Sequence, residues 1–312
     1  MVSKRKFTKR ILSVIIIFIV SFLIVSLTAT KFIYDGIFKR YDCPYHEYDP
    51  LSDKFTLNHQ NLNFYSGKNK LAGKLFKGDK NADTLVVFAP GFNSCSENYL
   101  FQITGLLDGG FAVFTFDATG HCASEGRSAK GFAQELLDLN AAINFIENKK
   151  RFGYNNIALV GYSMGGYAAC CALAENKNIS AVVSIAGINS AMEGVMSGAV
   201  RSVGSFVYAN WGGLWLYQSM LFGAETVNLR ADKILSQSAV PTLIIQGEDD
   251  ETVPMNRFSI YSHKEEIKSS NVEFVLRQDP ANDGHTDILF EDSSANGELM
   301  KIINDFLTEK VK

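Results

Sequence analysis

One pentapeptide, Gly-Tyr-Ser-Met-Gly at residues 161–165, constrains the fold of this 312-residue chain most strongly. It lies between the apolar run 157–160 and the small residues 166–170, a pattern typical of a strand that turns sharply into a helix. Glycine at both ends of the pentapeptide avoids clashes between the backbones that meet at such a turn. The turn is expected to hold the Ser163 hydroxyl exposed at a helix N-terminus, where unpaired backbone N–H groups stabilise negative charge.

A serine hydroxyl is a weak nucleophile at neutral pH, so it needs a histidine base and an acid that orients the histidine. After a serine in this context the partners follow in the order acid, then histidine. Two of the chain's five histidines lie downstream of Ser163. His263 belongs to the charged stretch 257–266, which predicts an amphipathic helix with a solvated histidine. His285 lies in a polar loop after the strand-like run 272–276, where catalytic side chains are usually displayed, and is favoured as the base.

The acid is expected at the end of another strand, between the serine and the histidine. The apolar run 241–246 ends in the acidic loop 247–254, Gly-Glu-Asp-Asp-Glu-Thr-Val-Pro. A solvated acidic turn is the alternative interpretation, and the loop lacks the glycine and ligand spacing of an EF-hand calcium loop. One of its carboxylates would accept the Nδ1 proton of His285 and fix the tautomer of the ring.

Strand-like and helix-like stretches alternate along the chain. Residues 61–65 and 71–76 alternate in polarity as a hairpin does. Short continuous apolar runs follow at residues 85–88, 112–116, 157–160 and 181–185. Such runs fit strands buried on both faces of a parallel sheet. Amphipathic helices are predicted at 129–148 and, closing the chain, at 297–311. The alternation predicts an α/β fold with a doubly wound, mostly parallel sheet and helices on both faces.

In this order the motifs resemble those of the α/β-hydrolase superfamily, from about residue 60 to the C-terminus. The stretch 86–92, Val-Val-Phe-Ala-Pro-Gly-Phe, resembles the strand and glycine that lead into the family's oxyanion residues. The stretch 116–126 is similar to the family's Asp-x-x-Gly-His-Gly-x-Ser-x-Gly loop. Cys122 replaces a glycine of that loop, and His121 falls on a position that is structural in the family.

The resemblance implies an α/β-hydrolase fold with a catalytic triad. Ser163 is the expected nucleophile and His285 the expected base. The pattern Asp-x-x-Val-Pro at residues 250–254 resembles the family's acid loop and favours Asp250, with Asp249 as the alternative.

Two backbone N–H groups are expected to form the oxyanion hole, one from Phe92 and one from Met164.

The implied reaction is acyl transfer from an ester or amide to water. The sequence is similar to the serine aminopeptidase-like and monoacylglycerol-lipase-like branches of the superfamily. A carboxylesterase or lipase with a small-molecule acyl ester as substrate is favoured. A serine aminopeptidase with a peptide-like substrate, an acyltransferase, and a noncatalytic membrane-anchored binding protein remain alternatives.

Residues 188–236 interrupt the alternation, at a position where the family commonly carries a lid. Both tryptophans of the chain, Trp211 and Trp215, lie in this segment. Aromatic and methionine side chains suit an apolar acyl chain, although they would equally serve to pack a lid onto the core.

The N-terminus has the pattern of a membrane anchor. Basic residues at positions 4–10 precede an uncharged apolar segment of twenty residues, which is long enough to cross a bilayer. A cleaved signal peptide is the alternative, but the apolar region is longer than usual and the cleavage pattern near Ala29 is weak. The basic cluster is expected to stay cytoplasmic, which places the catalytic domain on the other side of the membrane. The predicted parts are a cytoplasmic tail at 1–10, a signal anchor at 11–30, a linker at 31–58 and a hydrolase domain at 59–312.

Composition excludes several other classes. The net charge of −3 gives no case for nucleic-acid binding. The chain has no phosphate loop, dinucleotide fingerprint or zinc-ligand spacing, so we expect no cofactor and no metal. Its five cysteines show no disulfide-scaffold spacing, which counts slightly against an exported domain. Cys170 and Cys171 follow the serine in the expected helix and are interpreted as small packing residues.

Overall fold

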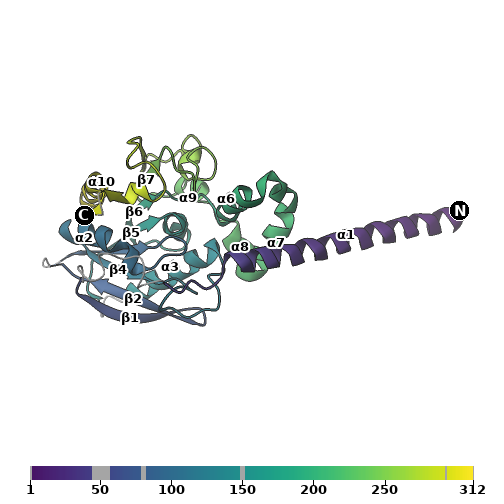
Figure 1. Ribbon diagram of the computed structural model, residues 1–312, viewed down its shortest axis with the longest axis horizontal. Helices are drawn as coiled ribbons and strands as arrows, with labels where there is room; N and C mark the ends of the chain where they lie inside the picture. Colours follow the sequence, from purple (N-terminus) through teal and green to yellow (C-terminus); the bar gives the residue numbers. More distant parts are fainter. Residues whose placement is uncertain (1, 44–56, 79–81, 148–151, 292–293, 312) are drawn as a thin grey trace.

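A computed structural model describes residues 2–43, 57–78, 82–147, 152–291 and 294–311 (Figure 1). Its centre is an eight-stranded sheet of order β1-β2-β4-β3-β5-β6-β7-β8. The antiparallel hairpin of β1 (His59–Ser66) and β2 (Asn69–Phe76) forms one edge. β2 pairs antiparallel with β4, and every further pairing is parallel. The parallel strands are β3 (Thr84–Ala89), β4 (Ala112–Phe116), β5 (Asn156–Tyr162), β6 (Ile179–Ile185), β7 (Thr242–Gly247) and β8 (Val272–Arg277). The predicted mostly parallel, doubly wound sheet is confirmed.

Helices cover both faces of the sheet because side chains of each strand alternate between them. In β3, Leu85 and Val87 belong to the core on one face, and Val86 and Phe88 to the core on the other. The first core contains side chains of α3 and α5, and the second contains those of α2 and α10. The bounds are α2 (Leu100–Asp108), α3 (Phe132–Ile146), α5 (Met164–Cys171) and α10 (Gly297–Lys310). A short ribbon of β9 (Phe290–Glu291) and β10 (Ser294–Ala295) precedes α10.

A group of helices stands between β6 and β7, in the segment expected to form a lid. Figure 1 shows α6 and α7 projecting from the sheet, and α7 lies beside the long N-terminal helix. The elements are α6 (Ala191–Val203), the 3₁₀ helix η3 (Gly204–Asn210), α7 (Trp211–Phe222), α8 (Ala224–Val227) and α9 (Ala231–Leu235). The lid boundaries of 188–236 remain a prediction, and these helices fall within them.

The N-terminal helix α1 (Val2–Ile37) continues seven residues beyond Thr30, into the stretch expected to be a linker. Its segment Phe7–Ile37 has a mean hydropathy of 3.0 over the most apolar window, and only 6% of that window is buried. The C-terminal end of α1 is less exposed, because a stripe of side chains four residues apart is buried against the domain. These are Ser26, Thr30, Tyr34 and, directly after the helix, Phe38. Residues 44–56 of the expected linker lie outside the described residues.

A disulfide between Cys43 and Cys122 ties the chain that follows α1 to the loop after β4. The two Cα atoms are 5.1 Å apart, and the cysteines are separated by 79 residues in sequence. Cys122 has a left-handed φ of +41°, at the position where the resembled loop has glycine. The sequence showed no disulfide-scaffold spacing and left the redox state of the cysteines open, because pairing between cysteines so distant in sequence depends on tertiary structure. Cys170 and Cys171 are buried in α5, as expected of packing residues.

Removing this disulfide should destabilise the domain. Closing a loop between cysteines 79 residues apart restricts the unfolded chain and is worth about 4 kcal/mol in the loop-entropy model. We expect dithiothreitol to lower the melting temperature of the wild type to that of the Cys43→Ser, Cys122→Ser double variant. The double variant itself should melt at the same temperature with and without reductant. A wild type that melts unchanged after complete reduction would contradict this assignment.

Candidate active site

Ser163 lies at the turn between β5 and α5, in a strained backbone conformation. Its φ is +54° and its ψ is −112°, a region that residues with a side chain rarely occupy. Its N–H donates to the carbonyl oxygen of Ile185 at 2.8 Å, and its own carbonyl accepts from Tyr167 at 3.2 Å. The residue is only 6% exposed, so the serine lies inside a cavity rather than on the open surface. Residues of α6, far from Ser163 in sequence, form part of the wall of this cavity, which the sequence around Ser163 does not encode.

The flanking glycines are required by close contacts between backbones. A Cβ atom on Gly161 would lie 2.1 Å from the carbonyl oxygen of Gly165. A Cβ atom on Gly165 would lie 2.1 Å from the carbonyl oxygen of Ala89, at the end of β3. Both distances are far below any permitted contact, so the start of α5 can approach β3 only with glycine at these positions.

His285 bridges the serine and an aspartate. Its Nε2 lies 3.0 Å from Ser163 Oγ, and its Nδ1 lies 2.7 Å from Asp250 Oδ2. The Tyr162 hydroxyl donates to the His285 carbonyl oxygen at 3.0 Å, and the two rings lie 5.1 Å apart. Tyr162 precedes the serine on the same strand, so one strand end positions both the serine and the histidine loop.

Asp250 is held by three further hydrogen bonds and is only 3% exposed. Its Oδ1 accepts from the backbone N–H groups of Thr252 at 2.9 Å and Val253 at 2.7 Å. Its Oδ2 accepts from the Gln246 side-chain amide at 3.0 Å, in addition to His285. The alternative acid, Asp249, is exposed and has no hydrogen bond to His285 among the described residues.

Gln246 was not identified as a site residue from the sequence. It is fully buried near the end of β7, and its amide contacts the carboxylate that contacts the histidine. The sequence did contain a signal for this residue: an amide at the end of the apolar run 241–246 needs a hydrogen-bond partner when it is buried.

The other candidate histidines lie elsewhere. His121 is buried, its Nδ1 lies 3.2 Å from the carbonyl oxygen of Thr119, and burial lowers the pKa of its imidazole. His263 contacts Glu266, and its Nε2 lies 3.9 Å from a carboxylate oxygen of Glu193 in α6. Its side chain is only 17% exposed, so the expectation of a solvated histidine is wrong. The physical reason is that the stretch 257–266 forms only a short 3₁₀ turn, which folds under α6 instead of standing as a helix in solvent.

The two expected oxyanion groups lie at the loop after β3 and at the start of α5. Gly91 donates its N–H to the Tyr99 hydroxyl at 2.9 Å, which fixes the loop one residue before Phe92. Phe92 and Ser163 line the same cavity. Within the described parts of the chain, the N–H groups of Phe92 and Met164 donate to no group outside their own elements. The N–H of Met164 is one of the unpaired donors at the start of α5.

The cavity that contains Ser163 has a volume of about 240 Å³. Its wall is mainly apolar, and Phe38, Phe92 and Phe132 form an aromatic cluster in it with ring centroids 5.3 to 6.2 Å apart. α6 contributes Val195 and Arg201. Ile37 and Phe38, at the end of α1, also line it, and sequence patterns did not place this part of the chain at the site.

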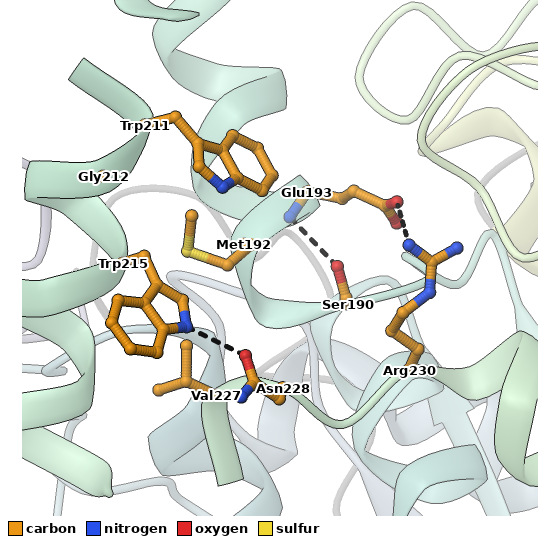
Figure 2. A pocket seen from close by; sticks show the side chains of 9 residues that line it. All are labelled: Ser190, Met192, Glu193, Trp211, Gly212, Trp215, Val227, Asn228 and Arg230. Atoms are coloured by element: carbon orange, nitrogen blue, oxygen red, sulfur yellow. Dashed lines mark hydrogen bonds and ion pairs between the residues drawn. The ribbon is translucent and has the colours of Figure 1, made fainter. Parts of the chain in front are cut away.

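The two tryptophans line a second cavity, of about 410 Å³, between α6 and α7 (Figure 2). Figure 2 shows Trp211 and Trp215 on one side of it and the ion pair of Glu193 and Arg230, at 3.7 Å, on the other. The Trp215 indole N–H donates to Asn228 at 2.9 Å. Burial raises the pKa of the Glu193 carboxyl. Neither tryptophan is among the residues that line the cavity of Ser163.

Comparison with known proteins agrees with this architecture. Residues 84–212 match the family described as the alpha/beta hydrolase fold. An esterase from Pyrococcus furiosus has a TM-score of 0.65 and 20% identity, over 88% of this chain and 100% of the esterase. The ferulic acid-bound Est1E from Butyrivibrio proteoclasticus has a TM-score of 0.60 and 18% identity, over 80% of this chain and 99% of that chain. An acylaminoacyl peptidase from Pyrococcus horikoshii has a TM-score of 0.57 and 18% identity, over 84% of this chain and 43% of that chain.

No curated protein matches the sequence significantly. The family match over residues 84–212 and the observed sheet topology show that this chain has the α/β-hydrolase fold. At identities of about 20% the likeness to solved structures concerns the fold alone. The roles of Ser163, Asp250 and His285, and of the N–H groups of Phe92 and Met164, stay predictions at this point.

The close approach at Gly165 leads to a mutational test. Gly165→Ala should lower stability by about 2 kcal/mol or more, because the added methyl group overlaps the Ala89 carbonyl. Gly212 is a matched control, since it is also the second residue of a helix and a Cβ atom there meets nothing within 4 Å. Gly212→Ala should change stability by at most about 1 kcal/mol. Thermal unfolding followed by circular dichroism checks both, and equal effects of the two substitutions would refute the close-contact explanation.

Proposed function

We propose that this protein is a serine hydrolase that cleaves an ester bond through Ser163, His285 and Asp250. The observation that carries the proposal is the continuous chain of hydrogen bonds from Ser163 Oγ to His285, at 3.0 Å, and on to Asp250, at 2.7 Å. A histidine needs to lie within about 2.6 to 3.2 Å of the proton donor to act as its base. The strained backbone of Ser163 supports the same assignment, because strain of this kind concentrates at functional sites.

In this mechanism His285 Nε2 removes the proton from Ser163 as Oγ attacks the carbonyl carbon of the substrate. Asp250 accepts the Nδ1–H bond, holds the ring in the required tautomer and stabilises the imidazolium that forms. His285 then gives the proton to the leaving alcohol, which leaves an acyl group on Ser163. Water, deprotonated by His285, attacks the acyl-enzyme and releases the acid.

Negative charge develops on the carbonyl oxygen during both attacks. The N–H groups of Phe92 and Met164 are proposed to donate to this oxygen. The support is that Phe92 lines the serine cavity, that Met164 directly follows Ser163, and that neither N–H donates to another element in the described chain. Met164 is also the first residue of α5, where the helix dipole favours an anion.

An ester is the favoured substrate, and an amide is the second candidate. The mainly apolar wall of the 240 Å³ cavity supports an acyl group of hydrocarbon character. The similarity to an acylaminoacyl peptidase keeps amide cleavage open, because the same serine chemistry acts on both bonds. Rates on acyl esters of increasing chain length, measured beside aminoacyl amides, distinguish the two.

We also propose that α1 is an uncleaved single-pass anchor, with its basic end in the cytoplasm and the hydrolase domain outside. The long apolar helix, its exposure and the preceding basic residues support this orientation. The disulfide between Cys43 and Cys122 is consistent with an oxidising compartment. The buried contact of Ser26 with Asn210 argues against cleavage near Ala29, because cleavage there would remove Ser26.

A fluorophosphonate probe tests the nucleophile. Wild-type protein should be labelled covalently, and Ser163→Ala should abolish the label because it removes the only atom that the probe phosphonylates. Ser184→Ala is a suitable control, since Ser184 is equally buried on the neighbouring strand β6. Labelling that persists in Ser163→Ala, with a phosphonylated peptide elsewhere, would rule out the proposed nucleophile.

Neighbouring aspartates test the acid. Asp250→Asn should lower kcat for a soluble ester by about 1,000-fold or more, because an amide stabilises the wrong tautomer of His285. Asp249→Asn removes the same charge from the adjacent, exposed position and should leave kcat close to that of the wild type. The opposite ranking of the two variants would transfer the role to Asp249.

A further inference from the structure

The lid is bonded directly to the membrane-spanning part of α1. Asn210, at the end of η3, accepts a hydrogen bond from the Ser26 hydroxyl and donates to Thr30 Oγ1 at 2.7 Å. Ser26 and Thr30 are both buried in this contact, although they belong to the uncharged segment 11–30. Polar side chains in such a segment normally face a protein partner, and here the partner is the lid.

The contacts also define how the lid is oriented along α1. Seven residues beyond Asn210, the Tyr217 hydroxyl donates to Asp35 Oδ1 at 3.0 Å. The Tyr34 hydroxyl donates to the next lid residue, Gln218, at 3.4 Å. α7 therefore runs alongside α1 in the same direction, as Figure 1 shows, and its N-terminus points toward the apolar span. At a rise of about 1.5 Å per residue, Ser26 lies about 7 Å before the first charged residue after the span, Lys31.

The end of the lid that reaches this level is apolar and exposed. Phe206 in η3 is 88% exposed, and Tyr208 and Trp211 are 39% and 41% exposed. We call these three side chains the lid tip. The Tyr208 hydroxyl accepts from Arg257, whose guanidinium lies over the Tyr208 ring at 5.4 Å from the centroid, so that the polar end of the residue is satisfied. Tryptophan and tyrosine are enriched at the boundary between the hydrocarbon and the headgroups of a bilayer, which is the depth that Asn210 sets.

The lid also connects this tip to the reaction site. α6 lines the cavity of Ser163 and leads directly into η3. Ile37 and Phe38, at the end of α1, line the same cavity. The end of α1 and α6 thus both reach the serine cavity, and α6 continues into the element that carries Phe206.

We propose that the lid tip lies in the bilayer interface at the end of α1, and that the cavity takes the acyl chain of a lipid ester from that leaflet. The position of the tip follows from the anchor and its contacts alone. The substrate class rests on the proposed hydrolase function. A protein partner that covers Phe206 is the alternative to the bilayer. The bilayer is favoured because Asn210 bonds the lid directly to the apolar span of α1.

Tryptophan fluorescence tests the position without any need for activity, because both tryptophans of the chain lie in the lid. Full-length Trp215→Phe protein, which retains only Trp211, is reconstituted in phosphatidylcholine vesicles with or without bromine on the acyl chains. We expect brominated lipid to remove most of the Trp211 emission and aqueous acrylamide to remove little. Emission that is equal in the two kinds of vesicle would overturn the proposal, whether a partner surface or water surrounds the tip.

Kinetics test the route of the substrate. Phe206→Asp should lose severalfold in rate on a long-chain ester embedded in the same vesicles and should keep the wild-type rate on a water-soluble acetate ester. Tyr65→Asp is the matched control, because Tyr65 is 67% exposed on the edge strand β1, and it should change neither rate. Full activity of Phe206→Asp on the embedded ester would refute entry from the membrane. A wild type that cleaves neither ester would instead refute the proposed hydrolase function, and the quenching result would stand on its own.

Discussion

The contact between the start of α5 and the end of β3 is the constraint on which the site depends. At Gly165 the helix approaches the Ala89 carbonyl so closely that no side chain fits, and at Gly161 the strand approaches the helix in the same way. Ser163 between them is forced into a left-handed conformation. This one turn therefore fixes the serine, the first N–H of α5 and, through Tyr162, the loop of His285.

The second determining feature is the stripe at the end of α1. An anchor that only tethered its domain would need no specific contacts with it. Here Tyr34 and Phe38 are part of the core and Asn210 bonds to Ser26 and Thr30, so α1 and the segment 188–236 are in direct contact. In the proposed arrangement, with α1 in the membrane, these contacts would fix the orientation of the domain relative to the bilayer, which a flexible linker would leave open.

The sequence predicted those parts of the molecule that depend on local patterns. Apolar runs located the parallel strands because strands buried on both faces carry no polar alternation. The spacing around Ser163 located the turn because only a few residue types tolerate its backbone. The remaining features depend on contacts between distant segments: α6 lines the serine cavity, Cys43 meets Cys122, and Phe38 reaches the cavity. Gln246 and the stripe on α1 are visible in the sequence as polar or aromatic residues within otherwise aliphatic runs.

The central claim is that Ser163 carries the acyl group during turnover. Mass spectrometry of protein quenched in acid during hydrolysis of an ester measures this directly. A mass increase equal to the acyl group, located on the peptide that contains Ser163 and lost when the ester is exhausted, is the predicted result. Continued hydrolysis by a protein that carries no acyl group, or one that carries it on another residue, would contradict the claim.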